Sequence, residues 1–119
     1  MTRRADNGQA TVELALAMPL LCVLALGVVQ LAMVMRDQIA AIEIARMAAR
    51  AAAVATDPMS AAATAAAAAR SDASVSTSIV GSTVTVEVSI VNSTDVPLIG
   101  AWLPAVELRS DASMLLEPP

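Results

Sequence analysis

The sequence of 119 residues has no histidine, lysine, tyrosine or phenylalanine, one cysteine (Cys22) and one aromatic residue (Trp102). Without imidazole, amine or a second thiol, most routes to nucleophilic catalysis, general base chemistry and transition-metal binding are closed. A single cysteine forms no internal disulfide, so it does not reveal the redox compartment. We therefore disfavour an enzyme, and we expect no cofactor and no small-molecule substrate.

Positive charge is also scarce, because seven arginines stand against eleven acids and the net charge is -4. A phosphate-binding surface needs concentrated positive charge, so we expect no nucleic-acid partner. The chain also lacks the aromatic bulk on which a compact core normally draws. Yet 57% of its residues are apolar, and this content needs an explanation other than an ordinary soluble core.

Much of the apolar content lies in residues 14–35, a run of 22 residues without a charge. The run is interrupted only by Pro19, Gly27 and Gln30. As a helix this run is about 33 Å long at ~1.5 Å per residue, which is enough for the ~30 Å hydrocarbon core of a bilayer. Arg3 and Arg4 stand before the run. The positive-inside tendency then predicts a single-pass protein of the cell membrane with a cytoplasmic N-terminus and residues 37–119 outside.

A cleaved signal peptide is the alternative to a permanent span. Arg3 and Arg4 would be its basic region and Ala25-Leu26-Gly27 its small-residue cleavage site. The apolar run, however, continues past Gly27 to Met35 and merges into a helical pattern. That continuity favours the membrane span, in which we expect Cys22 to be a small buried hydrophobic residue.

Residues 36–55 contain no proline or glycine and predict that the helix continues beyond the membrane. At 100° per residue, Arg36, Glu43, Arg46 and Arg50 fall within one arc of about 80°. The opposite face is alanine-rich, with Asp37 as its one charge: Ala41, Ala45, Ala48, Ala49, Ala52 and Ala55, flanked by Ile42 and Ile44. We expect this thin face to pack closely on another element. A solvent-exposed helix face with a Glu43–Arg46 ion pair is enough to explain the charged arc, and no further function is needed.

A second helix follows, with Asp57 as its N-cap and Pro58 at its first position, and it ends near residue 70. Its alanine runs have no identifiable chemistry. After Ser71 the apolar period changes from helical to two, which predicts a hairpin with Gly81-Ser82 as the turn. A third strand is expected over residues 106–116.

The link over residues 96–104 is unusually apolar for a loop. We expect Trp102 to be an anchor over the small sheet, with contact to a partner as the alternative. Three strands from about 45 residues bury too little surface alone. The sheet is therefore expected to pack on the alanine-rich helix face, on neighbouring subunits, or on both.

The predicted fold class is α+β: a long N-terminal helix that continues outside the membrane, a short alanine-rich second helix and a small antiparallel sheet of about three strands. We divide the chain into a leader (1–8), a transmembrane helix (9–35), an extracytoplasmic helical region (36–70) and a β domain (71–119).

Glu13 stands at the edge of the apolar run, where a carboxylate is costly in lipid and usually marks a function. The alternative is an acid favoured by the helix macrodipole among the headgroups. Gly8 decides between them, because cleavage after Gly8 would leave Glu13 as the fifth residue of a chain beginning at Gln9. This arrangement resembles the type III prepilin signal, a short basic leader that ends in glycine, followed by glutamate and an apolar helix.

The blocks from Gly8 to Leu21, Leu26 to Gln30 and Ala45 to Ala53 resemble TadE-like pseudopilins of the Flp/Tad (tight adherence) pilus system, in the form seen in actinobacteria. The resemblance implies a membrane protein cleaved by a prepilin peptidase between Gly8 and Gln9 and then used as a minor pilin. Its implied partners are other pilins and Tad assembly proteins. Glu13 would neutralise the N-terminal amine of an adjacent subunit. A permanently anchored scaffold of a secretion apparatus is the alternative, and incorporation into the pilus stays open.

Overall fold

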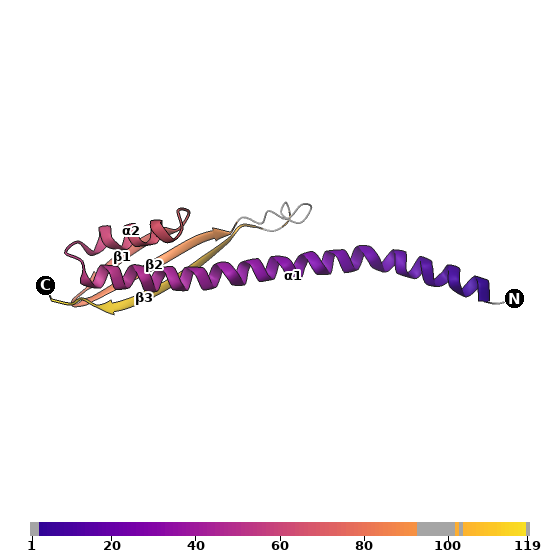
Figure 1. The fold of residues 1–119 in the computed structure, drawn as a ribbon, viewed down its shortest axis with the longest axis horizontal. Coiled ribbons are helices and arrows are strands. Elements are labelled where there is room, and N and C mark those ends of the chain that lie inside the picture. Colours follow the sequence, from indigo (N-terminus) through magenta and orange to yellow (C-terminus); the bar gives the residue numbers. More distant parts are fainter. Residues whose placement is uncertain (1–2, 93–101, 103, 119) are drawn as a thin grey trace. The chain divides into compact units, whose positions relative to one another are not determined.

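The computed structural model describes residues 3–92, 102 and 104–118. The elements over these residues are α1 (Arg3–Val54), α2 (Pro58–Ala69), β1 (Ser74–Val80), β2 (Thr83–Asn92) and β3 (Val106–Leu115) (Figure 1). The fold is α+β with a long first helix, a short second helix and a three-stranded antiparallel sheet, as predicted. The chain divides into two compact units, Met1–Ala32 and Met33–Pro119.

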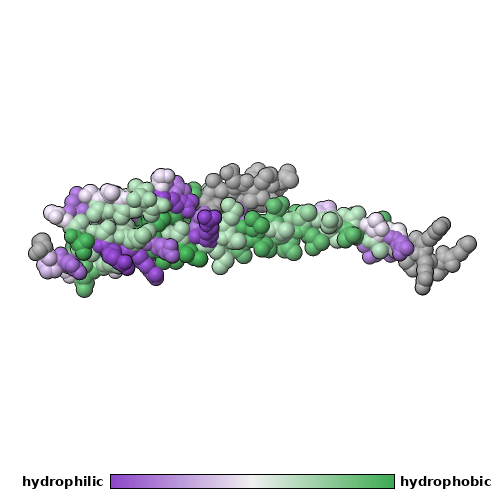
Figure 2. All heavy atoms as spheres, viewed as in Figure 1, coloured by the Kyte–Doolittle hydropathy of each residue, from purple (hydrophilic) through white to green (hydrophobic). Residues whose placement is uncertain are grey.

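The described part of the first unit is entirely helical, none of its charged residues lies beyond Glu13, and Pro19 lies inside its helix. Its large apolar side chains are exposed, and green hydrophobic atoms dominate this part of α1 in Figure 2. Among the described residues, α1 is the one helix long and apolar enough to cross a membrane, and none of its most apolar window is buried. Cys22, which was expected to be buried, is exposed, because the described residues of this unit form a single helix.

The second unit is a layer of helices on one face of the sheet, whose strand order is β1-β2-β3. The central strand β2 turns four side chains inward, and each is fully buried: Val84, Val86, Val88 and Ile90. Its neighbours in β1 and β3 on the same face are half-buried, except Ile79, which is exposed at the edge, whereas the opposite face is more open to solvent. The sheet is therefore one-sided, as its period of two predicts.

The part of α1 in this unit meets the core through alanine. Five of the six alanines predicted on the contact face are completely buried, namely Ala41, Ala45, Ala48, Ala49 and Ala52, and Ala55 is half-buried. Ala62 and Ala66 of α2 and the valines of β2 complete the same cluster. Because alanine presents only a methyl group, backbones approach closely and the core closes without aromatic bulk. The predicted packing of the sheet on the alanine face is confirmed.

The connections follow the predicted chemistry. The Asp57 carboxylate caps α2 by accepting from the backbone N–H groups of Met59 (3.2 Å) and Ser60 (3.4 Å). Gly81 opens the hairpin turn at φ +61°, a left-handed conformation that glycine adopts without steric cost. At the far end of α1, the Ala53 carbonyl accepts from the Glu117 N–H at 3.0 Å, which satisfies one of the free carbonyls that end the helix.

Candidate functional site

The predicted cleavage position lies inside α1, where Gly8 and Gln9 are both helical and exposed. A Cβ atom placed on Gly8 would meet nothing within 4 Å, so no packing demands glycine there. Glycine costs a helix interior about 1 kcal/mol relative to alanine. Gly8 therefore makes this turn of the helix easier to open.

Glu13 lies one helical turn beyond Gln9 on the same face. The Gln9 side-chain amide donates a hydrogen bond from Nε2 to Glu13 Oε1 at 3.4 Å. The Glu13 side chain is exposed and stands where the apolar surface of α1 begins. The first unit thus brings together the three N-terminal residues singled out in the sequence, with the carboxylate within reach of the residue that cleavage would make first.

The chain was compared with known families, curated proteins and solved structures. Residues 8–50 of the 119 match the family model described as TadE-like protein. The chain is TadE-like over this segment. The match begins at Gly8, takes in Glu13 and the apolar run, and ends at Arg50, so the TadE-like segment coincides with most of α1. No curated protein and no solved structure matches the chain.

A TadE-like segment points to involvement in the Tad pilus system and, together with the apolar helix, to association with a membrane. The sheet lies outside the matched segment.

Trp102 belongs to the second unit. Its side chain is 88% exposed, so the expectation that it tucks over the sheet was wrong. An indole held against strands would lose most of its accessible surface. The rest of the predicted apolar link, apart from Pro104, lies outside the described residues.

Sequence reasoning missed an ion pair between the helices. Asp37, the one charge on the alanine face, accepts from Arg70 Nη1 at 2.9 Å, and its side chain is 17% exposed. Arg70 also donates from Nε to Asp72 at 2.6 Å. These hydrogen bonds raise the pKa of Arg70 and hold the pKa of Asp72 below its ordinary value. Asp37 thus ties α1 to the end of α2, and its place on the alanine face was the signal that it needed a partner.

Another cluster of charges lies on the solvent face of the sheet. Arg109 on β3 donates from Nε and Nη2 to the two carboxylate oxygens of Glu107, both at 3.1 Å. Ser89 Oγ donates to Glu107 Oε1 at 2.8 Å. The hydrogen bonds from Arg109, and to a smaller extent the one from Ser89, hold the pKa of Glu107 below its ordinary value. This face has a defined charge pattern that periodicity alone did not show.

A half-open hollow of about 630 Å³ lies where the end of α1, the hairpin turn and the segment after β3 meet. Val54, Pro58, Gly81 and Leu116 are among its lining residues. Of the described residues that line it, Glu117 is the one with an ionisable side chain. The hollow places the end of α1 and the hairpin turn at one level of the second unit.

Proposed function

We propose that this chain is a minor pilin or pseudopilin that takes part in assembly of a Flp/Tad-type type IV pilus, after a prepilin peptidase has cleaved it between Gly8 and Gln9. The observation that carries the proposal is the spacing from Gly8 to Glu13 at the start of an exposed apolar helix, within a TadE-like segment. A stop-transfer helix needs neither residue at that spacing.

The chemistry of the N-terminus supports this role. Cleavage would remove the charged leader and create an α-amine on Gln9, whose side chain already reaches the Glu13 carboxylate. An amine and a carboxylate about 4 Å apart attract by roughly 1 kcal/mol in water and by roughly 4 kcal/mol at an effective dielectric constant near 20. A neighbouring copy that brings its amine to Glu13 in the membrane would therefore be selected over one that does not. Glu13 would act in assembly and leave insertion to the apolar run.

A variant of Glu13 tests the proposal. Glu13→Leu should leave membrane insertion unchanged, because it extends the apolar run, but it should reduce incorporation and pilus output. Glu13→Gln keeps the size and removes the charge, so it should share the defect if pairing with an amine is what matters. Glu117→Leu, which removes an exposed glutamate from the second unit, is the matched control. Normal piliation with Glu13→Leu would contradict the proposed role.

The alternative function, a permanently anchored scaffold of a secretion apparatus, differs in the N-terminus of the mature chain. N-terminal sequencing of the protein from native membranes should find a start at Gln9 for a processed pilin. A start near Met1 would support the permanent anchor. A start at Val28 would indicate an ordinary secreted protein released by signal peptidase.

A further inference from the structure

The solvent side of α1 in the second unit forms a surface that we call the arginine stripe: Arg36, Glu43, Arg46 and Arg50 with Ile39, Met47 and Val54 between them. The stripe has a net charge of +2, and its apolar members are 48–67% exposed. In the described part of the chain, none of its four charged residues forms an ion pair, so the predicted Glu43–Arg46 pair is absent. Arg46 and Arg50 stand four residues apart, a spacing at which like charges on a helix repel.

The solvent face of the sheet forms a second surface, the acidic face, made of Glu87, Glu107, Arg109 and Asp111, with a net charge of -2. Glu87 on β2 is paired directly with Asp111 on β3, and like charges directly opposite each other destabilise a sheet. Arg109 forms an ion pair with Glu107 at 3.1 Å and a longer one with Glu87 at 3.8 Å, which offsets part of this repulsion. Within the described residues Asp111 has no ion-pair partner.

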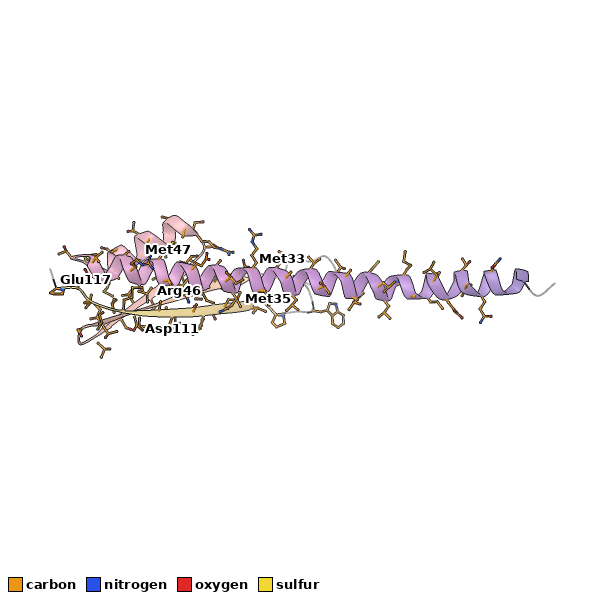
Figure 3. The ribbon with its side chains drawn as sticks, turned by 60° about the horizontal axis from the view of Figure 1, so that its bottom comes forward. Met33, Met35, Arg46, Met47, Asp111 and Glu117 are labelled. Carbon is orange, nitrogen blue, oxygen red and sulfur yellow. The ribbon has the colours of Figure 1, made fainter. Side chains whose placement is uncertain are left out.

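The two surfaces are complementary in charge, +2 against -2. Arg46 and Arg50 follow one another along the helix, about one turn apart, whereas Glu87 and Asp111 lie side by side on neighbouring strands. Each arginine of the stripe would therefore face an acid of the other surface without a one-to-one match of spacing. Figure 3 labels Arg46 on α1 and Asp111 on β3. Each surface carries a repulsion that the other would relieve.

The pairs also lie at similar heights. The end of α1 and the hairpin turn border the same hollow and so share one level. From Val54, Arg50 and Arg46 are roughly 6 and 12 Å along the helix at 1.5 Å per residue. From Thr83, Glu87 is roughly 14 Å along its strand at 3.4 Å per residue. Two copies that stand in the same direction would therefore bring the opposite charges together with a shift of only a few ångströms.

We propose that the arginine stripe of one copy docks on the acidic face of a second copy of this chain. The contact uses different surfaces on the two partners, so it leaves one surface of each copy free and can repeat without closing. The charge match carries the contact itself, while the shared direction of the copies rests on the proposed function, which anchors each by the same helix. Repetition of this contact would give a row of copies joined by their second units.

Mixed disulfides between two tagged copies test the contact. Both are full-length, carry Cys22→Ser and are co-expressed in membranes, one with Arg50→Cys and the other with Asp111→Cys. Oxidation should give a disulfide that contains both tags. The matched control replaces Asp111→Cys with Ala68→Cys, an exposed position on α2 that belongs to neither surface. Crosslinking to the control position should be at least about tenfold slower, because random encounters lack complementary charge.

Charge reversal separates docking from loss of folding. Arg46→Glu in the Arg50→Cys copy should slow crosslinking by about tenfold, and Glu87→Lys in the other copy should restore the rate. Restoration would show that the first variant is folded, because a change in the partner copy cannot rescue an unfolded chain. No mixed disulfide, equal crosslinking to Ala68→Cys, or no effect of reversal would overturn the contact.

A mature chain beginning at Gln9 together with no mixed disulfide would refute this contact while leaving the pilin proposal standing. An uncleaved chain that still crosslinks would support this contact and refute the pilin proposal.

Discussion

The adjacent alanines Ala62 and Ala63 of α2 give a sharp test of how the second unit is packed. Ala62 is completely buried against the cluster formed by α1 and the valines of β2, whereas Ala63 points to solvent. Leucine at either position adds three carbon atoms to the side chain on the same helix. At Ala62 the added bulk should cost about 1–3 kcal/mol of unfolding free energy through overpacking, and at Ala63 the change should stay within about 0.5 kcal/mol.

Hydrogen exchange of β2 in the full chain in detergent micelles measures this difference, because these amides report on the second unit alone. A loss of 1–3 kcal/mol corresponds to about 5- to 150-fold faster exchange of the most protected amides. Ala62→Leu should show this acceleration and Ala63→Leu should not. If both variants exchange like the parent, or if both accelerate equally, the close alanine packing described above would be refuted.

Three further predictions concern the turn, the cap and the acid response of the second unit. Gly81→Ala should cost about 1–2 kcal/mol, entirely from the left-handed backbone because the space beside Gly81 is open, and faster exchange of the hairpin amides would show it. Asp57→Ala should cost about 0.5–2 kcal/mol and release the first amides of α2, measurable by their exchange, whereas Asp57→Asn should retain most of the cap. Hydrogen bonds lower the pKa of Asp72 and of Glu107, so the stability they contribute is present above their unfolded pKa of about 4 and is lost as pH falls through their lower folded values. A carboxyl chemical-shift titration should show both lowered values, and an unchanged Glu107 titration in Arg109→Gln would contradict the stated cause.

Much of this fold could be predicted because its signals are local. The alanine face of α1, the Asp57 cap, the Gly81 turn and the period of two in the strands are each encoded within a few residues. Each depends on backbone preference or on which face of one element is apolar. Such features need no knowledge of what the element packs against.

Apart from the local Glu43–Arg46 pair, what was missed or wrong mostly concerns residues whose state depends on distant parts of the chain. Asp37 and Arg70 are 33 residues apart, and only the packing of α2 beside α1 brings them together. Burial of the Trp102 indole would require a surface elsewhere in the chain to receive it, and no local pattern specifies such a surface. The indole is exposed. The pairing of Glu87 with Asp111 likewise requires the register of two strands separated by a long link.

The N-terminal site was predicted in a different way. Gly8, Gln9 and Glu13 lie within six residues of one helix, so their relative placement follows from helical geometry once the helix is accepted. Their chemical role does not follow from that geometry, because an exposed glutamate near a helix start has ordinary structural reasons to be there. The TadE-like match over residues 8–50 gives this spacing its meaning.

Processing after Gly8 and entry of the processed chain into a pilus can be measured together. The most direct measurement is the intact mass and N-terminal sequence of this chain recovered from sheared pili of the native host, compared with the membrane fraction. We expect a chain that begins at Gln9 in the pilus fraction, with no copies there that retain Met1. A full-length chain beginning at Met1, confined to the membrane fraction of piliated cells, would contradict it.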